Sequence, residues 1–476
     1  MMTRHRNLAI AVLAVATFVD LMDATIVNVA LHAMQTDLDA APAALEWVVG
    51  GYALAFACML VTGARLGDLH GRRTVFVAGV IGFTLASAAC ALAPDAGVLV
   101  GARIVQGGFA AVMVPQLLST LQAIFSPAER GPMYGVIGAI AGLAAVAGPI
   151  LGGWLVTNDI AGLGWRSIFL INVPIGTVLA LAALAFVPNT RSPHSTRIDL
   201  AGVLLLTAGV GGIVYGLIEG GQVGWPVWVF AVIGAGIVVT GGFVVHQLRR
   251  ERHGREALLP MRLFADRGYR SGLVVQWCFQ AAMIGYFLTL AVYLQAGLGF
   301  TAWQAGLALT PFSVAGVIGS GIAVPLAPRL GKTIVIAGAL MLAAGTWWSL
   351  QIILDRGTAL TEWDLLPGTA LAGAGLSLLV VPLIDIALAG VSVTDAGAAS
   401  GAFSTVQQLG AAFGAALVGM VFFGTLGTGV PAWLPAFQQA SWIVIGGFTL
   451  SALASLALPD LATVRAHRSP QNLMEG

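Results

Sequence analysis

Long apolar stretches, separated by short polar segments, run along the whole chain. A hydrocarbon core about 30 Å thick is crossed by roughly 20 residues of apolar helix. Backbone groups in lipid must bond within their own segment, and these stretches lack the alternation of barrel strands, so each is expected to be a helix. The pattern predicts fourteen membrane-spanning helices, at residues 8–31, 44–64, 74–94, 96–119, 133–156, 165–187, 199–218, 226–247, 271–294, 304–326, 332–354, 365–389, 398–423 and 438–458.

Basic residues gather in every second connection between these stretches. Cytoplasmic loops of membrane proteins collect Arg and Lys. Arg72 and Arg73 follow the second stretch, and seven arginines lie between residues 249 and 270, after the eighth. The alternation predicts a multi-pass protein of the cytoplasmic (inner) membrane with both termini cytoplasmic. Asp20 and Asp23 inside the first stretch, and its length, argue against a cleaved signal peptide.

Composition supports a membrane protein and excludes several other classes. The chain is 58% hydrophobic and 9% charged, whereas soluble domains carry about 25% charged residues. The net charge of +1 excludes a nucleic-acid partner, which needs a basic patch. The three cysteines show no metal-ligand spacing, and Lys332 lacks the glycine pattern of an ATP-binding loop. We therefore expect no metal, no cofactor and no enzymatic activity.

A weak internal repeat indicates two related halves. Residues 63–73 and 328–332 both place a Gly and a basic residue between two apolar stretches. If they correspond, a six-helix half at residues 1–190 and another at 271–476 flank an inserted pair of helices at 191–270. Repeated halves around a site near the bilayer midplane are common in transporters.

Several short motifs occur in a consistent order on these predicted helices. They are Leu21–Leu31, Gly63–Arg73, Arg103–Ala111, Gly148–Gly153, Trp165–Gly176 and Ile198–Gly202. Together they resemble the major facilitator superfamily and, within it, the fourteen-helix drug:proton antiporters. The resemblance implies an all-α major facilitator fold. It also implies export of small amphipathic or hydrophobic compounds, of the drug or antibiotic class, in exchange for protons by alternating access, as a monomer. Ala144, Asp20 and Pro328 depart from the family pattern.

Few ionisable residues lie deep in the predicted helices. An ionisable group at that depth is unfavourable by several kcal/mol and is a functional candidate by default. Asp20 lies about 18 Å along its helix from Leu8, and Asp23 is nearly on the same face. Two close carboxylates in a low dielectric resist ionising together, so they are candidates for proton coupling or for binding a cationic substrate. A structural hydrogen bond is the alternative.

Arg103 is the only arginine deep in a predicted helix, at about the depth of Asp23. Because an unpaired arginine at that depth is unfavourable, we expect it to pair with Asp23, provided that the first and fourth helices adjoin as the resemblance implies. The pair either controls the acid's proton affinity or is purely structural.

The resemblance assigns roles to further residues. It implies a conformational latch in the turn after the second helix, formed by Gly63, Gly67, Asp68, Gly71, Arg72 and Arg73. The alternative, a positive-inside anchor, leaves Asp68 unexplained. Gly148, Pro149, Gly152 and Gly153 form either the antiporter motif or a face for close helix packing. Substrate contacts are expected at Asn28, Gln106, Gln407 and Gln408. For Gln407 and Gln408 the alternative is a hydrogen bond to a neighbouring helix.

Other functions remain open at this stage. An importer, or a transporter of one endogenous metabolite, would share most of these features, and a receptor without transport is a weaker alternative. The roles of Glu219 and Asp385, near helix ends, are also open.

The topology gives a first prediction. Reporter fusions at Met1 and at Gly476 should both score as cytoplasmic, because the basic connections and the even helix count agree. One fusion on the outside would exclude an even number of spans.

Overall fold

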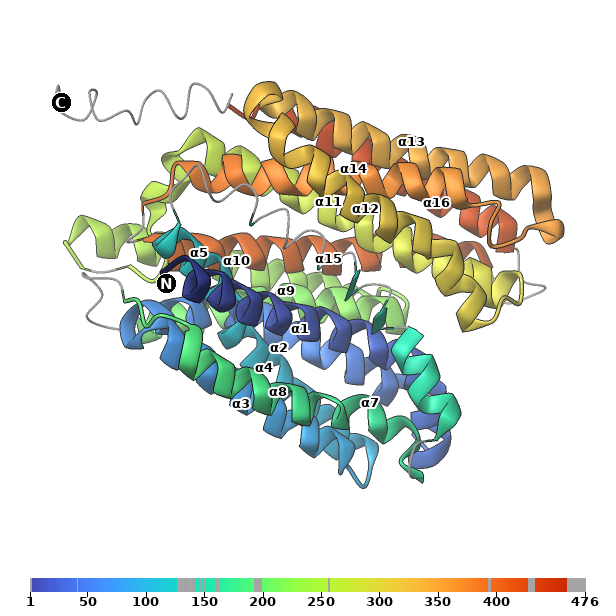
Figure 1. Ribbon diagram of the computed structural model, residues 1–476, viewed down its shortest axis with the longest axis horizontal. Helices are drawn as coiled ribbons and strands as arrows, with labels where there is room; N and C mark the ends of the chain where they lie inside the picture. The colour runs from blue at the N-terminus through green and yellow to red at the C-terminus, as the bar shows by residue number, and fades with distance from the viewer. Residues whose placement is uncertain are drawn as a thin grey trace. The chain divides into compact units, whose positions relative to one another are not determined.

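A computed structural model describes most of the chain. The described residues are 2–40, 42–125, 133, 140, 143–144, 147–148, 150–159, 162–191, 199–255, 257–392, 395–426 and 433–459. Within these ranges the regular structure is helical and contains no strand. The expected all-α fold is therefore confirmed (Figure 1).

The chain divides into two compact units. Unit 1 comprises Met1–Ile124, Leu143–Met261 and Val393–Leu409, and unit 2 comprises Phe125–Gly142, Arg262–Ser392 and Gly410–Gly476. Up to residue 252 the described helices are α1 (Met2–Leu38), α2 (Pro42–His70), α3 (Arg72–Ala91), α4 (Ala96–Met113), α5 (Pro115–Ile124), η2 (Gly164–Arg166), α7 (Ser167–Leu170), α8 (Asn172–Phe186), α9 (Leu200–Val223) and α10 (Val227–Arg252). Beyond it they are η3 (Met261–Ala265), α11 (Arg267–Val292), η4 (Tyr293–Gly297), α12 (Ala302–Leu330), α13 (Lys332–Arg356), η5 (Gly357–Ala359), α14 (Leu366–Ala389), α15 (Ala396–Leu426) and α16 (Trp433–Ser455).

Among the described residues, twelve helical spans are long and apolar enough to cross a membrane. They match twelve of the expected stretches, and the first, Leu8–Leu31, has the predicted bounds. The last expected stretch is helical as α16, but it is not among the twelve, since Gln438 and Gln439 lower its hydropathy. The stretch at 133–156 lies largely outside the described residues. The count of fourteen and the domain boundaries at 190 and 270 therefore stay predictions.

Two helix boundaries differ from the sequence-based expectation. Residues 65–70 were expected beyond the end of the second helix, which is wrong, because α2 continues to His70 and only Gly71 separates it from α3. Gly71 has a φ of 98°, a conformation that favours glycine. The expected single helix at 96–119 is interrupted at Val114, where Pro115 begins α5 and cannot donate a backbone hydrogen bond.

Close helix packing holds unit 1 together. α2 packs on both α4 and α9, while α3 packs on α4 and α8 (Figure 1). A methyl group added at Gly63 would lie 2.3 Å from the carbonyl oxygen of Ala111, so glycine is needed for α2 to approach α4 this closely. A cluster of buried apolar side chains, including Ile26, Leu99 and Phe169, fills the space among α1, α4 and α7.

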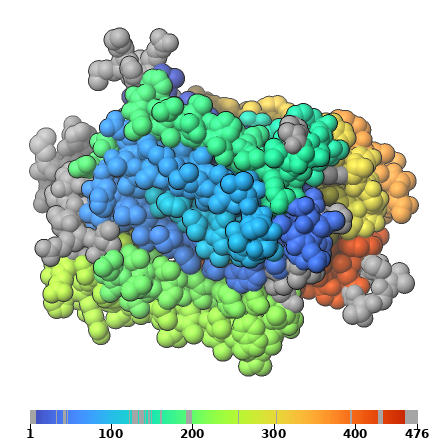
Figure 2. All heavy atoms as spheres, turned by 90° about the horizontal axis from the view of Figure 1, so that it is seen from below, coloured from blue at the N-terminus to red at the C-terminus, as the bar shows by residue number. Residues whose placement is uncertain are grey.

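The predicted inserted helices, α9 and α10, pack against each other and belong to unit 1. In Figure 2 their residues, coloured green to yellow-green, form a continuous outer layer. α9 contacts α2, where the Cys58 thiol lies 3.6 Å from the carbonyl oxygen of Thr207 and the Trp47 and Tyr215 rings are 5.7 Å apart. α9 thus covers one side of α2.

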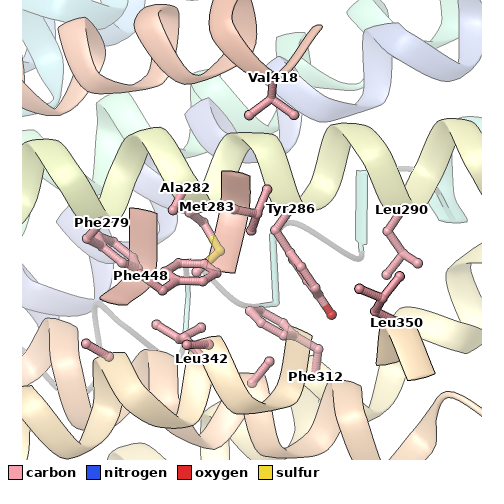
Figure 3. Close-up of a cluster of buried hydrophobic side chains, with 14 of the residues drawn as sticks. Phe279, Ala282, Met283, Tyr286, Leu290, Phe312, Leu342, Leu350, Val418 and Phe448 are labelled. Atoms are coloured by element: carbon pink, nitrogen blue, oxygen red, sulfur yellow. The ribbon is translucent and has the colours of Figure 1, made fainter. Parts of the chain in front are cut away.

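Unit 2 has its own apolar core. α13 packs on α14 and α16, and α12 packs on α14. Phe279, Met283 and Tyr286 of α11 face Phe312 and Phe448 across this core (Figure 3). The Tyr286 and Phe312 rings stack with centroids 5.9 Å apart. Among the described residues of unit 2, this core thus consists of aromatic and aliphatic side chains rather than of a cluster of charges.

Candidate functional site

Arg103 lies at the centre of a buried polar cluster in unit 1. α4 carries it among α1, α2 and α8, with 1% of its surface exposed. Its Nε donates to the carbonyl oxygen of Val48 at 3.1 Å, and its Nη1 donates to Gln106 at 2.7 Å. The guanidinium carbon lies 4.2 Å from the centre of the Tyr52 ring, in a cation–π contact. The guanidinium of Arg103 thus donates hydrogen bonds along its edge, while the Tyr52 ring covers one of its faces.

Asp23 is the ionic partner of Arg103. The Arg103 Nη1 and Asp23 Oδ2 atoms are 2.5 Å apart, and both side chains are buried. The other carboxylate oxygen, Oδ1, accepts from Asn172 at 2.7 Å and from Gln106 at 3.1 Å. The pairing predicted from equal depth is confirmed, while its role in proton coupling stays a prediction.

Asp20 and Tyr52 form the second part of the cluster. Asp20 lies one turn before Asp23 on α1 and is 5% exposed. The Tyr52 hydroxyl donates a hydrogen bond to Asp20 Oδ1. Because the ring of Tyr52 also covers Arg103, this one side chain contacts both Asp20 and the Asp23–Arg103 pair.

Asn172 connects the cluster to α3 and to the start of α8. Its amide nitrogen donates to Ser87 at 3.0 Å as well as to Asp23, and Ser87 donates to the carbonyl oxygen of Phe169. Cys90 of α3 lies 3.6 Å from the Gln106 amide oxygen. Asp23 therefore sits in a network supplied by four helices, which fixes its orientation.

Asp68 forms a second buried ion pair, at the other end of α2. Its Oδ1 is 3.0 Å from the Arg72 Nη2 atom, and both side chains are at most 1% exposed. The other oxygen faces the first turn of α15, since a methyl group at Gly397 would lie 2.1 Å from Oδ2. A helix N-terminus favours a negative charge. Asp68 thus links the end of α2 to the start of α15 within unit 1.

The remaining residues of this predicted latch have distinct surroundings. Arg72 also donates to Thr190, at 3.4 Å, whereas Arg73 is half-buried and donates to the Leu184 carbonyl oxygen. Gly67 packs against Gln116, where any side chain would overlap the amide. The turn therefore contains one buried arginine and one half-buried arginine.

The predicted antiporter motif is only partly described. Pro149 lies outside the described residues. Gly148 and Gly152 pack against α1, where added methyl groups would lie 2.0 Å from Thr25 Oγ1 and 2.7 Å from Ile26 Cγ1. Gly153 has more room, with its nearest neighbour at 3.9 Å. Gly148 and Gly152 thus permit close packing on α1 at Thr25 and Ile26, up to one turn beyond Asp23.

The predicted substrate contacts do not form one group. Asn28 is exposed and bonds to the Ala24 and Thr25 carbonyl oxygens of its own helix. Gln106 is fully buried and belongs to the Asp23 network. Gln407 and Gln408 are partly buried on α15. Substrate contact by these residues stays a prediction.

Two further carboxylates, which lie outside the membrane-spanning segments, connect neighbouring helices through hydrogen bonds. Arg166 and Trp165 donate to Asp37 beyond the end of the first span, and these bonds hold the pKa of Asp37 below its usual value. Burial would raise the pKa of Asp199, yet hydrogen bonds from His246, Gln247 and the Gly202 amide hold it below its usual value. Asp199 thus joins the start of α9 to α10.

Comparisons with known proteins identify the family of this chain. Residues 13–415 match the model of the Major Facilitator Superfamily. The chain belongs to that superfamily. It is therefore a membrane transporter rather than an enzyme.

The superfamily includes close relatives of this chain. It is 41% identical over 425 residues to the probable actinorhodin transporter of Streptomyces coelicolor, covering 89% of this chain and 74% of the relative. It is 34% identical over 420 residues to the puromycin resistance protein pur8 of Streptomyces alboniger, covering 87% and 81%.

A solved structure supports the same fold. The proton:xylose symporter XylE matches with a TM-score of 0.68 at 15% identity, over 98% of this chain and 100% of that one. At this identity the likeness shows the major facilitator fold alone.

Two residues of the cluster were not predicted as site residues. Asn172 lies inside the motif Trp165–Gly176, but a neutral side chain at a helix start gave no signal of its own. Tyr52 sits in an apolar stretch among many aromatic residues. Polar side chains bond to Asp20 from α2 and to Asp23 from α4 and α8, and only the packing reveals which helix faces meet there.

The Arg103–Asp23 contact predicts that substitutions of these two residues have strongly coupled effects on stability. Arg103→Met and Asp23→Asn should each destabilise the protein, Arg103→Met by about 3–5 kcal/mol, because each leaves a buried charge without its partner. The double variant should lose clearly less than the sum of the two, as measured by thermal unfolding of the purified protein. Additive losses would show that the contact is not coupled.

Proposed function

We propose that this protein exports small amphipathic or hydrophobic compounds of the antibiotic class across the cytoplasmic membrane in exchange for protons. The observation that carries the proposal is the buried cluster of Asp20, Asp23 and Arg103, which places titratable carboxylates within a span of an apolar bundle. Carboxylates at that depth mark ion or proton pathways in membrane proteins.

The relatives support the substrate class. One is described as a probable actinorhodin transporter and another confers puromycin resistance. Both names refer to antibiotics handled by the cell, which favours export over import.

Proton exchange supplies the energy in this proposal. One elementary charge moving across 100 mV is worth about 2.3 kcal/mol, enough to concentrate a compound roughly fiftyfold. The protein then acts as a monomer in the inner membrane with both termini cytoplasmic. Binding and release alternate between the two sides of the membrane.

The Asp68 contacts suggest a device that controls the change of state. Asp68 pairs with Arg72 and faces the first turn of α15, so a movement of that turn would break the contact. The exchange between states is often the step that limits turnover in such proteins. We infer that this contact stabilises the state in which it forms.

Two substitutions test that latch. Asp68→Asn and Gly397→Val should each slow transport about tenfold, corresponding to roughly 1.4 kcal/mol, with little change in substrate affinity. Turnover in reconstituted vesicles is the measurement. Gly424→Ala is the control, because a methyl group there meets nothing within 4 Å. Unchanged turnover in Asp68→Asn would exclude the latch.

Everted vesicles test the transport function itself. Vesicles with an acidic interior should accumulate puromycin or actinorhodin, and a protonophore should abolish the uptake. Asp23→Asn should abolish proton-driven accumulation, because Arg103 loses its ionic partner in the cluster. Asp355→Asn makes the same chemical change at an exposed position near the end of α13 and should transport normally.

Two outcomes would contradict the proposal. Accumulation by the Asp23→Asn variant against a gradient would remove that residue from the coupling site. Energised vesicles that accumulate neither compound would exclude the substrate class.

A further inference from the structure

The cluster in unit 1 contains more negative than positive charge. Arg103 is protonated at every pH that a protein meets. Asp20 and Asp23 are 5% and 0% exposed, and among the described residues only Asp23 forms an ion pair with Arg103. If both acids were ionised, one negative charge would remain uncompensated in a low-dielectric region. That is unfavourable by several kcal/mol, so one acid is neutral in this conformation.

The two acids are held by very different donors. Asp23 accepts from the Arg103 guanidinium, from Gln106 and from Asn172, which engages both of its oxygens. Within the part of the chain that the structure describes, Asp20 accepts one hydrogen bond, from the neutral hydroxyl of Tyr52. Donors to the ionised form stabilise that form, and a charged donor does so most strongly. Asp23 is therefore the ionised acid and Asp20 the neutral one.

Tyr52 contacts both the neutral Asp20 and the partner of the ionised Asp23, Arg103. Its hydroxyl donates to Asp20 Oδ1, which leaves Oδ2 as the oxygen that carries a proton. Its ring covers the Arg103 guanidinium at 4.2 Å, so it lies between Asp20 and the only cation of the cluster that the structure describes. The backbone of Tyr52 is fixed against α4, since a methyl group at Gly107 would lie 2.3 Å from its carbonyl oxygen.

We propose that Asp20 carries the exchanged proton, that Asp23 stays ionised as the partner of Arg103, and that Tyr52 is a positioning residue for the Asp20 carboxyl. The O–H bond on Asp20 forms with a proton from water on the outer side and breaks when the carboxyl is open to the cytoplasm, where water accepts the proton. Among the described residues, the titratable groups near Asp20 are Asp23 of its own helix, Tyr52 of α2 and Arg103 of α4. This inference rests on the proton exchange proposed above.

Infrared difference spectroscopy tests the assignment without substrate or gradient. The full-length protein in liposomes at neutral pH should show the C=O band of a buried protonated carboxyl, and Asp20→Asn should lose it. Tyr52→Phe should keep the band but shift it, because the Tyr52 hydroxyl bonds to Asp20 and not to Asp23. Asp20→Glu should restore a band at a changed position.

The opposite results would overturn the assignment. A band that survives Asp20→Asn, or that stays at the same frequency in Tyr52→Phe, would place the proton on another carboxyl. Asp355→Asn is the control and should leave the spectrum unchanged, since that side chain is exposed. Because the band is measured without transport, a failure of proton-driven uptake in vesicles would contradict the proposed function and leave this readout intact.

Discussion

The ion pair between Arg103 and Asp23 constrains the arrangement of unit 1. A guanidinium within a membrane span must find bonds for its edge and cover for its face. Three helices supply them, with Asp23 from α1, Val48 and Tyr52 from α2 and Gln106 from α4 itself, while Asn172 from α8 donates to Asp23. A helix that moves relative to the others must break or exchange one of these bonds. The Arg103–Asp23 pair therefore stabilises the helices of unit 1 and also makes their arrangement depend on the charge of these two side chains.

Small residues make this polar centre possible. Gly63 and Gly107 let α2 and α4 approach until the carbonyl of Val48 reaches Arg103 and the ring of Tyr52 covers it. Gly148 lets another helical segment pack on α1 beside Thr25. Gly397, at the start of α15, leaves room for the Asp68 side chain at the end of α2. The abundance of glycine thus has a specific consequence, since it places buried charges within bonding distance.

The sequence predicted the apolar spans and the Arg103–Asp23 pair because both follow from length and depth along a helix. It could not predict Tyr52 and Asn172, since their place in the cluster depends on which faces of α2 and α8 turn inward. It also assigned residues 65–70 to a loop, because Gly67 was interpreted as a turn residue, whereas Gly67 permits close packing against Gln116 within α2. Periodicity gives the position of a residue along its helix, but tertiary packing decides its neighbours.

The central claim is that Asp20, one of the two buried acids, carries the proton that is exchanged for substrate. The most direct measurement loads proteoliposomes with puromycin, removes it from outside, and follows the internal pH with no initial pH gradient. The account predicts that outward puromycin flow drives protons inward and acidifies the interior, and that Asp355→Asn does the same while Asp20→Asn does not. Puromycin leaving without any change in internal pH would contradict it.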